Sequence, residues 1–410
     1  MGTTFKMYQI LATRRISYYI FCGGILLRIF YALTLKDPKN SGPDSVKYVD
    51  ATLDLVHKGF FANTENIRLF APGYSIFMSP IYFLGDNLSL VTIFLQAAIF
   101  LTTTYLLHKS IAVKYGNFPA NITSTLLLYT PIMVDSTTSI MYEAVAISLT
   151  ILWARTLIVG IEFKEQTPRK IILIICILSF SFPFLHPRFI GLSLIFSILV
   201  YFFIEKKIGA VAMLFACLAP FLLSLRNLVA TGSFYSAGNT GVTFATGTHV
   251  NWNQNWEILC PKLIGLTTKF TQNWDNVALN CGVKIVKEDP LRWVSLIPRK
   301  TLEHFEPFIF RFGGAVRFED VIFSGPTVLQ TIWFILFILT MWISVKVLLV
   351  NEKTKSLAWS LVASTVWLWL VSVLFFGYAR YRVVALPFLY FGIAMVLARY
   401  FEKKEVGKID

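Results

Sequence analysis

Long apolar runs, roughly 15 to 22 residues each and separated by short polar breaks, recur along almost the whole chain. Because a helix needs about 20 apolar residues to cross a bilayer, the pattern predicts an all-α polytopic membrane protein. The composition agrees, since 56% of the residues are hydrophobic and only 15% are charged. We expect about ten spans: Tyr18 to Leu35, Leu88 to Leu107, Phe118 to Met133, Ile140 to Val159, Ile171 to Leu185, Phe189 to Ile204, Ile208 to Leu225, Val328 to Leu349, Leu357 to Phe376 and Val383 to Leu397.

Lysine and arginine collect in every second connection between these spans, which is typical of cytoplasmic loops. The residues are Lys109, Lys114, Lys164, Arg169, Lys170, Lys206, Lys207, Lys353, Lys355, Lys403, Lys404 and Lys408. We therefore expect a multi-pass protein of the cytoplasmic (inner) membrane, in contact with membrane lipids and with both termini cytoplasmic. The net charge of +14 is spread over membrane-flanking positions and forms no single patch, so we expect no nucleic-acid partner.

Residues 1–410 are predicted to form a single transmembrane domain with two long external segments, at about 36–87 and 226–327. In the first segment we expect an interfacial helix that is capped by Ser41, carries Asp44 and Tyr48 on one face, and ends at Gly59. Apolar residues follow from Pro72 to Leu84. That stretch is too short to span, so we place it against the membrane surface or as a re-entrant piece.

The second external segment alternates tryptophan with polar and basic residues, as helices at a bilayer surface do. It also contains Cys260 and Cys281, whereas the other three cysteines fall within expected spans. Disulfides form in oxidising compartments outside the cytoplasm, and a loop of about 20 residues is long enough for such a bond to stabilise. The sequence thus predicts a Cys260–Cys281 disulfide.

Arginines recur at the outer ends of the expected spans, where the inside bias of basic residues predicts few of them. They are Arg188, Arg226, Arg380 and Arg382, joined by Arg28, which lies within the first span. A guanidinium near hydrocarbon is costly unless it is paired, and a phosphate at the membrane surface has a geometry that suits it. The group therefore favours a site for the phosphate of a lipid. The alternative is that each arginine reaches lipid headgroups or pairs with a nearby carboxylate.

Two carboxylates on the outer side are candidates for catalysis. Asp44 falls in the first turn of the expected interfacial helix, where the helix dipole favours the anion that a general base requires. Glu143 falls at the outer end of the fourth span. The alternatives are a helix-capping role for Asp44 and an interfacial ion pair for Glu143. The five histidines show no metal-ligand spacing, so we expect neither a metal nor a cofactor.

Taken in order, these elements resemble the GT-C glycosyltransferases, and more narrowly the bacterial relatives of protein O-mannosyltransferases and the lipid A aminoarabinose transferase. The resemblance runs from about Tyr18 to Leu397 and rests on Asp44-x-x-x-Tyr48, Pro72-Gly-Tyr74, Glu143, His186-Pro-Arg188, Arg226-Asn227, Asn239-Thr-Gly241 and Ala379-Arg380-Tyr-Arg382. One departure is Ser45, which stands where many protein mannosyltransferases have a second acidic residue.

The resemblance implies a GT-C-like helical bundle that transfers a sugar, with inversion, from a polyprenyl-phosphate lipid donor to an extracytoplasmic hydroxyl on a glycan, lipid or protein acceptor. Asp44 matches the catalytic aspartate of the family, with Glu143 as a second catalytic candidate. The five arginines are candidates for binding the donor phosphate. Tyr48, Tyr74 and Asn239 are candidates for binding the substrate.

Two other classes of function stay open. A polysaccharide polymerase or ligase with a diphosphate-linked donor shares the outward arginines. A lipid flippase or transporter is expected to have repeated halves and ionisable groups near the bilayer midplane, whereas the polar signal of this sequence lies at one surface.

Overall fold

The computed structural model describes residues 11, 13–42, 44–64, 66–67, 71–163, 167–236, 240–248, 274–305, 328–375 and 379–406, and all regular structure within them is helical. Six of these helical segments are long and apolar enough to cross a membrane: Arg14–Thr34, Pro72–Tyr115, Tyr142–Phe163, Lys206–Thr231, Thr331–Leu349 and Lys355–Leu374. The prediction of an all-helical chain with several candidate membrane spans is confirmed at this level.

The first half of the chain contributes α2 (Arg14–Thr34), η1 (Pro38–Asn40), α3 (Ser45–Lys58), α5 (Pro72–Met78), η2 (Ser79–Asn87), α6 (Leu88–Tyr115), α7 (Asn117–Tyr129), α8 (Pro131–Thr138), α9 (Tyr142–Gly160), η3 (Ile161–Phe163), α10 (Arg169–Leu185) and η4 (Pro187–Phe189). The second half contributes α11 (Ile190–Phe203), α12 (Lys206–Thr231), α13 (Thr240–Gly247), α16 (Trp274–Glu288), α17 (Pro290–Ser295), α18 (Ile297–His304), α20 (Val328–Leu349), α21 (Lys355–Leu374), η5 (Ala379–Val384) and α22 (Leu386–Val406).

The other four expected spans coincide with α7, α10, α11 and α22. The first three have 13, 17 and 14 residues, fewer than a straight crossing of the bilayer needs. Proline contributes to this shortness, because α7 stops before Pro131 and α10 stops before Pro187. The count of ten spans therefore stays a prediction.

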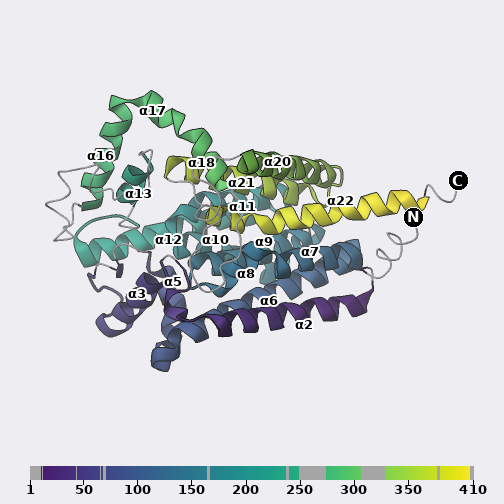
Figure 1. Cartoon of the computed structure of the whole chain (residues 1–410), viewed down its shortest axis with the longest axis horizontal. Helices are drawn as coiled ribbons and strands as arrows, with labels where there is room; N and C mark the ends of the chain where they lie inside the picture. The colour runs from purple at the N-terminus through teal and green to yellow at the C-terminus, as the bar shows by residue number, and fades with distance from the viewer. Residues whose placement is uncertain are drawn as a thin grey trace.

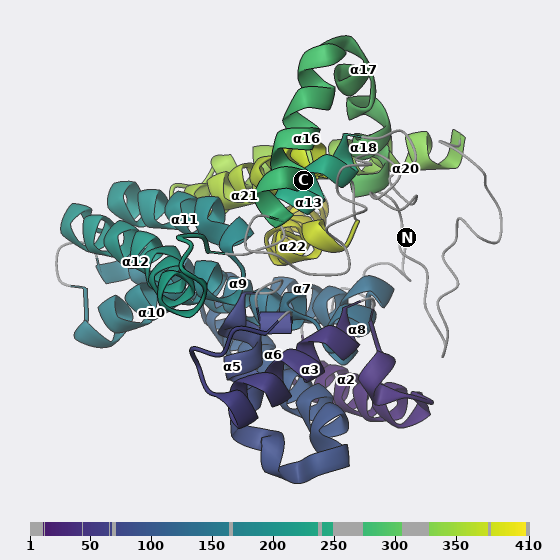
Figure 2. The ribbon, with the colours of Figure 1, turned by 90° about the vertical axis from the view of Figure 1, so that its left-hand side faces the viewer.

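The bundle has two distinct ends (Figure 1). Helix α2 begins and α22 ends at one of them, whereas α3, α5, α13 and α16 lie at the other. Viewed from the latter end, α10, α11 and α12 form one side of the molecule, α2, α3, α5 and α6 another, and α16, α17 and α18 a third (Figure 2). Helix α9 packs against α6, α10, α22 and η5 and is the most buried of the six candidate spans. The side chains at its start therefore lie where these groups of helices meet.

Helix α3 begins at Ser45, later than the sequence suggests, and Asp44 is the residue that precedes its first turn. The expected cap by Ser41 is wrong, because the Ser41 hydroxyl accepts a hydrogen bond from the main chain of Ile140 instead. The predicted end at Gly59 is confirmed, since this residue has a φ of 88°, a value that glycine adopts without steric cost.

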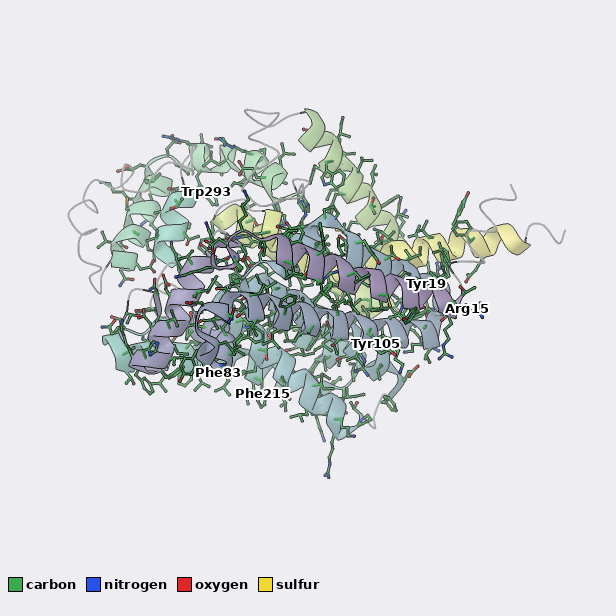
Figure 3. The ribbon with its side chains drawn as sticks, turned by 60° about the horizontal axis from the view of Figure 1, so that its bottom comes forward. Arg15, Tyr19, Phe83, Tyr105, Phe215 and Trp293 are labelled. Carbon is green, nitrogen blue, oxygen red and sulfur yellow. The ribbon has the colours of Figure 1, made fainter. Side chains whose placement is uncertain are left out.

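The expected short helix after Pro72 is present as α5, and most of its residues are buried in the protein. At Gly73 a β-carbon would lie 2.0 Å from the main-chain oxygen of Phe184, so only glycine allows α5 to approach α10 this closely. Phe83, in the following η2, lies at the same end of the bundle as Trp293 of α17, whereas Arg15 and Tyr19 lie at the far end (Figure 3).

Gly241, from the Asn239-Thr-Gly241 motif, has a packing role. A β-carbon on Gly241 would lie 2.0 Å from the main-chain oxygen of Asp275, and the Asp275 carboxylate accepts hydrogen bonds from the main-chain N–H groups of Gly241 and Val242. Gly241 therefore allows α13 to lie directly against α16, which caps it.

Lys300 joins helix α18 to the end of α21. Lys300 is buried and donates hydrogen bonds to the main-chain oxygens of Val373 and Phe375, at 2.8 and 3.1 Å. Burial lowers the pKa of Lys300 to about 8, against an opposing effect of Glu303. These bonds satisfy carbonyl groups at the end of α21, immediately before the segment that leads to η5.

Candidate functional site

The Asp44 carboxylate forms an ion pair with Arg380, which lies 336 positions away in the sequence. Both terminal nitrogens of Arg380 lie 3.0 Å from Oδ2 of Asp44. On its other side, Nε of Arg380 lies 3.5 Å from Oε1 of Glu143. One guanidinium thus lies between the two carboxylates that the sequence singles out.

The exposure of these three groups falls from Asp44 to Glu143. The side chains of Asp44 and Arg380 are 22% and 18% exposed, whereas that of Glu143 is 3% exposed. Burial alone would lower the pKa of Arg380, but the carboxylates of Glu143 and Asp44 outweigh it and raise the pKa above its ordinary value. Arg380 therefore stays charged, and the Asp44 end of the site is the end that solvent or a substrate can reach.

Glu143 lies in the first turn of α9, after a residue with extended backbone. Both of its carboxylate oxygens are buried, and neither accepts a hydrogen bond from a described residue. A buried carboxylate is expensive unless nearby charges compensate it, and here the compensation comes from Arg380. A buried carboxylate without a hydrogen-bond donor among the described residues requires an explanation, and a binding or catalytic role would supply one.

Arg188 completes the charged part of the site. Its guanidinium lies over the ring of Tyr381 at 4.3 Å and over that of Tyr142 at 5.6 Å. Its Nε donates to Nδ1 of His186 at 3.1 Å, whereas its buried Nη1 donates no hydrogen bond to the described residues. Burial and the guanidiniums of Arg188 and Arg380 lower the pKa of His186 well below its ordinary value, so His186 is a neutral acceptor.

We refer to Asp44, Glu143, Arg188 and Arg380 as the charged cluster. Its two carboxylates and two guanidiniums give a formal charge of zero when all four are ionised. Among the described residues, no group of three or more His, Cys, Asp and Glu side chains is arranged to hold a metal ion. The two guanidiniums of the cluster are suited to stabilising an added anion.

Tyrosine rings pack beside the charged cluster. Tyr48 of α3 lies edge to face with Tyr74 of α5 at 5.1 Å and with Tyr142 at 6.0 Å. Burial, with smaller effects of Tyr142 and of the cluster carboxylates, raises the pKa of Tyr48 well above its ordinary value, so it stays a neutral phenol. The Tyr74 hydroxyl donates to Oε1 of Gln96 at 2.8 Å. The two tyrosines that the sequence predicts as substrate-binding thus lie together beside the cluster.

Arg28 and Arg226 bind other parts of the protein. Arg28 is buried and donates to the main-chain oxygens of Gly24 and Leu128. Arg226 donates to the main-chain oxygens of Phe60 and Ala62, at 2.8 and 2.7 Å, and to its neighbour Asn227. The structure thus gives both guanidiniums carbonyl partners, Arg28 within the bundle and Arg226 at the loop after α3.

Arg382 has a different environment from Arg380, although both lie on η5. Its Nη1 donates to the main-chain oxygen of His304 at 3.1 Å, and its guanidinium lies 5.8 Å from the ring of Phe337. These contacts join η5 to α18 and α20. The phosphate-binding role predicted for Arg382 remains a prediction, and the contacts give this residue a bracing role in addition.

Two predicted site residues, Asn239 and Cys260, lie outside the described residues. Cys281, on α16, is disulfide-bonded, whereas Cys22, Cys176 and Cys217 are free. The Cys260–Cys281 pairing therefore stays a prediction.

Sequence reasoning missed the roles of Tyr142, His186 and Tyr381. Each adjoins a residue that the sequence does identify, namely Glu143, Pro187-Arg188 and Arg380. Their packing around Arg188 depends on contacts between α9, η4 and η5, which no local pattern encodes. The one sequence feature that could have identified them is their position, because each is an aromatic or imidazole residue close to a charged residue at the end of a span.

Compared with models of known protein families and with curated proteins, the sequence matches none of them.

Proposed function

We propose that the protein is a GT-C type glycosyltransferase of the cytoplasmic membrane that uses a polyprenyl-phosphate sugar as its donor and an extracytoplasmic hydroxyl as its acceptor. The observation that carries the proposal is the ion pair between Asp44 and Arg380. Four segments that carry the resemblance, around Asp44, Glu143, Arg188 and Arg380, contribute to one charged cluster although they are far apart in sequence. Convergence of this kind is expected of a catalytic site and is not needed for membrane insertion.

The chemistry assigned to the cluster is a single displacement. Asp44 accepts the proton of the acceptor hydroxyl, and the acceptor oxygen forms a bond to the anomeric carbon of the donor sugar. The bond from that carbon to the phosphate oxygen breaks, its electron pair stays on the phosphate, and polyprenyl phosphate leaves. One displacement inverts the anomeric carbon. Arg380, with Arg188 behind it, stabilises the charge that grows on the phosphate.

The contact between Asp44 and Arg380 sets an order of binding in this scheme. While the donor is absent, both terminal nitrogens of Arg380 are engaged by Asp44. A donor phosphate competes for the same nitrogens, and Asp44 is thereby released to accept a proton from the acceptor. Glu143 holds the opposite edge of Arg380 and keeps the guanidinium at the site during this exchange. Donor binding therefore precedes deprotonation of the acceptor.

The proposal includes the finer topology expected from the sequence, with about ten spans, both termini in the cytoplasm and the charged cluster outside. Two features support it. Helices α2 and α22 have their terminal ends on the same side of the bundle (Figure 1). The cluster includes Asp44, the residue directly before α3, and α3 lies at the opposite end of the bundle (Figure 1).

The charge of the cluster favours a monophosphate donor over the diphosphate donor of a polymerase or ligase. A sugar linked through one phosphodiester adds a single negative charge, whereas a diphosphate adds two to a cluster that is formally neutral. In a partly buried site each uncompensated charge is costly. We therefore expect the purified protein to bind a polyprenyl-monophosphate sugar at least tenfold more tightly than the polyprenyl-diphosphate sugar of the same chain length.

Native mass spectrometry of the detergent-solubilised protein, titrated with the two lipids, measures this preference. Arg292→Ala is a suitable control, because Arg292 is exposed on α17 and its removal should leave both affinities unchanged. Equal affinity for the two lipids, or preference for the diphosphate, would favour the polymerase or ligase class. Movement of the lipid from one leaflet to the other in reconstituted vesicles, without any sugar transfer, would favour a flippase.

A further inference from the structure

Three serines link the segment that carries Asp44 to the segment that leads into Glu143. The main-chain N–H of Ile140 donates to Oγ of Ser41 at 2.9 Å, and Oγ of Ser45 donates to the main-chain oxygen of Ile140 at 3.1 Å. In the opposite direction, Oγ of Ser139 donates to the main-chain oxygen of Ser41 at 3.0 Å. We call these residues, Ser41, Ser45, Ser139 and the main chain of Ile140, the serine clamp.

The two segments are closely packed at the clamp. Ser45 is fully buried at the start of α3. A β-carbon on Gly42 would lie 2.9 Å from Oγ of Ser45 and 3.0 Å from Cγ of Met141, so a larger residue at position 42 would push the segments apart. A buried hydrogen bond that loses one partner leaves the other unsatisfied, which makes such contacts strong positional constraints.

A fourth contact extends the clamp toward the tyrosines of the site. Nε2 of Gln96, on α6, donates to the main-chain oxygen of Ser139, and Oε1 of the same amide accepts the hydroxyl of Tyr74. The Gln96 amide therefore connects α5 with the clamp. Residues 139–140 therefore bond on one side to the serines that flank Asp44. On the other side they bond to Gln96, which holds the ring of Tyr74.

We infer that Ser41 and Ser45 are positioning residues that fix the base against its ion partners, an inference that rests on the proposed function. Asp44 lies between these two serines in the sequence, and Glu143 follows Ile140 by three residues. Without the clamp, the Asp44 carboxylate would be held only by its exchangeable pair with Arg380, which the donor phosphate disrupts. The clamp keeps Asp44 in place when the donor phosphate has displaced it from Arg380.

The same geometry explains why serine suits position 45. Its hydroxyl donates to a carbonyl oxygen, which an ionised carboxylate at this position could not do. An acid there would face that oxygen without a proton to share and would add a second negative charge beside Asp44. Ser45→Asp should therefore be more damaging than Ser45→Ala, although aspartate is the larger and more polar replacement.

The test is a set of variants measured for kcat, for donor affinity and for amide exchange. We expect Ser41→Ala and Ser45→Ala each to lower kcat about tenfold and the double variant about a hundredfold, with the Kd for polyprenyl phosphate changed less than twofold, because small misplacement of a catalytic group affects turnover before binding. Ser41→Thr, which keeps the hydroxyl at a partly exposed position, should restore kcat.

The matched control is Thr52→Ala on the same helix. Thr52 is fully buried, but its hydroxyl donates to the main-chain oxygen of Tyr48 within α3 and makes no bond to residues 139–140. If Ser41→Ala and Ser45→Ala lower kcat no more than Thr52→Ala does, the positioning role is overturned. If Ser41→Thr fails to restore kcat while folding normally, the hydroxyl is not what matters and the inference also fails.

Hydrogen exchange separates failure of the clamp from failure of the proposed function. The Ile140 amide should exchange at least tenfold faster in Ser41→Ala than in the wild type, because its acceptor is removed. Unchanged exchange would overturn the clamp whatever the activity. Faster exchange in a protein that transfers no sugar from any donor would uphold the clamp as a structural contact and overturn the proposed function together with the catalytic role of the serines.

Discussion

Replacing Asp44 by asparagine should lower the rate of sugar transfer by two or more orders of magnitude while the protein inserts and folds normally. Asparagine has nearly the same shape but cannot accept the proton of the acceptor hydroxyl, and loss of a general base typically costs about 10²- to 10⁴-fold in rate. The Asp44 side chain is partly exposed and makes no helix-capping bond of its own, so its loss should disturb the fold little. Single-turnover transfer with preloaded donor measures the effect on the chemical step.

Asp50→Asn is the matched control for this prediction. Asp50 lies on the same helix and pairs with Lys39 at 2.9 Å, but it takes no part in the charged cluster. Its replacement should leave the transfer rate within about twofold, because exposed ion pairs contribute little. Near wild-type turnover by Asp44→Asn would remove Asp44 from the mechanism and leave it as a partner of Arg380 only.

Replacing Arg380 by alanine should weaken binding of polyprenyl phosphate by about 1.5 to 3 kcal/mol, the range of a charge-assisted hydrogen bond. This corresponds to an increase in Kd of roughly 10- to 150-fold. Arg380→Lys keeps the charge but loses the fork of two terminal nitrogens that contacts Asp44, so its Kd should fall between those of alanine and the wild type. Native mass spectrometry with the monophosphate lipid gives all three values.

The alanine variant leaves Glu143 buried without its nearest cation, so its thermal unfolding must be compared with that of the wild type. Arg380→Lys provides the check, because it retains a cation beside Glu143 and still lacks the bidentate contact. Arg382→Ala, whose guanidinium is occupied by the His304 carbonyl, should raise the Kd less than Arg380→Ala. Unaltered donor affinity in both Arg380 variants would show that this residue only braces the site.

For the arginines, the sequence predicts which residues are candidates but not which groups they bind. Sequence alone indicates all five as outward-facing cations, four at the outer ends of spans and Arg28 within the first span. Two of them, Arg188 and Arg380, lie in the charged cluster, whereas Arg226 is occupied by carbonyl groups of residues that are more than 160 positions away. Residue type and sidedness follow from local sequence, but the partner of a guanidinium depends on which distant loop the fold brings to it.

The start of α3 also shows that a local pattern predicts backbone geometry better than it predicts the partner of a side chain. Ser41 has the residue type and position of a helix cap, and Gly59 has those of a helix end. The glycine prediction is confirmed because it depends on local backbone geometry alone. The serine prediction is wrong because a partner 99 positions away, the Ile140 N–H, takes its hydroxyl. Asp44, which replaces it at the cap position, leaves its carboxylate for Arg380.

The membrane character of the chain was predictable because it depends on the length and apolar content of continuous segments. Six candidate spans follow from these properties directly. The three expected spans that lie on α7, α10 and α11 are shorter, and α7 and α10 each stop just before a proline, at positions that hydropathy alone does not register. For such helices, tilt and partner helices decide whether they cross the bilayer, and neither is encoded in a window of sequence.

We expect the charged cluster to transfer a sugar from a lipid monophosphate to an acceptor hydroxyl. The most direct measurement is transfer of radiolabelled sugar by the purified protein, reconstituted in vesicles and supplied with polyprenyl-monophosphate or polyprenyl-diphosphate sugars and a membrane extract as the source of acceptor. We expect labelled product of inverted configuration, with release of polyprenyl phosphate, from at least one monophosphate donor with the wild type and at least a hundredfold less with Asp44→Asn. Transfer only from diphosphate-linked donors, or equal transfer by wild type and Asp44→Asn, would contradict the account.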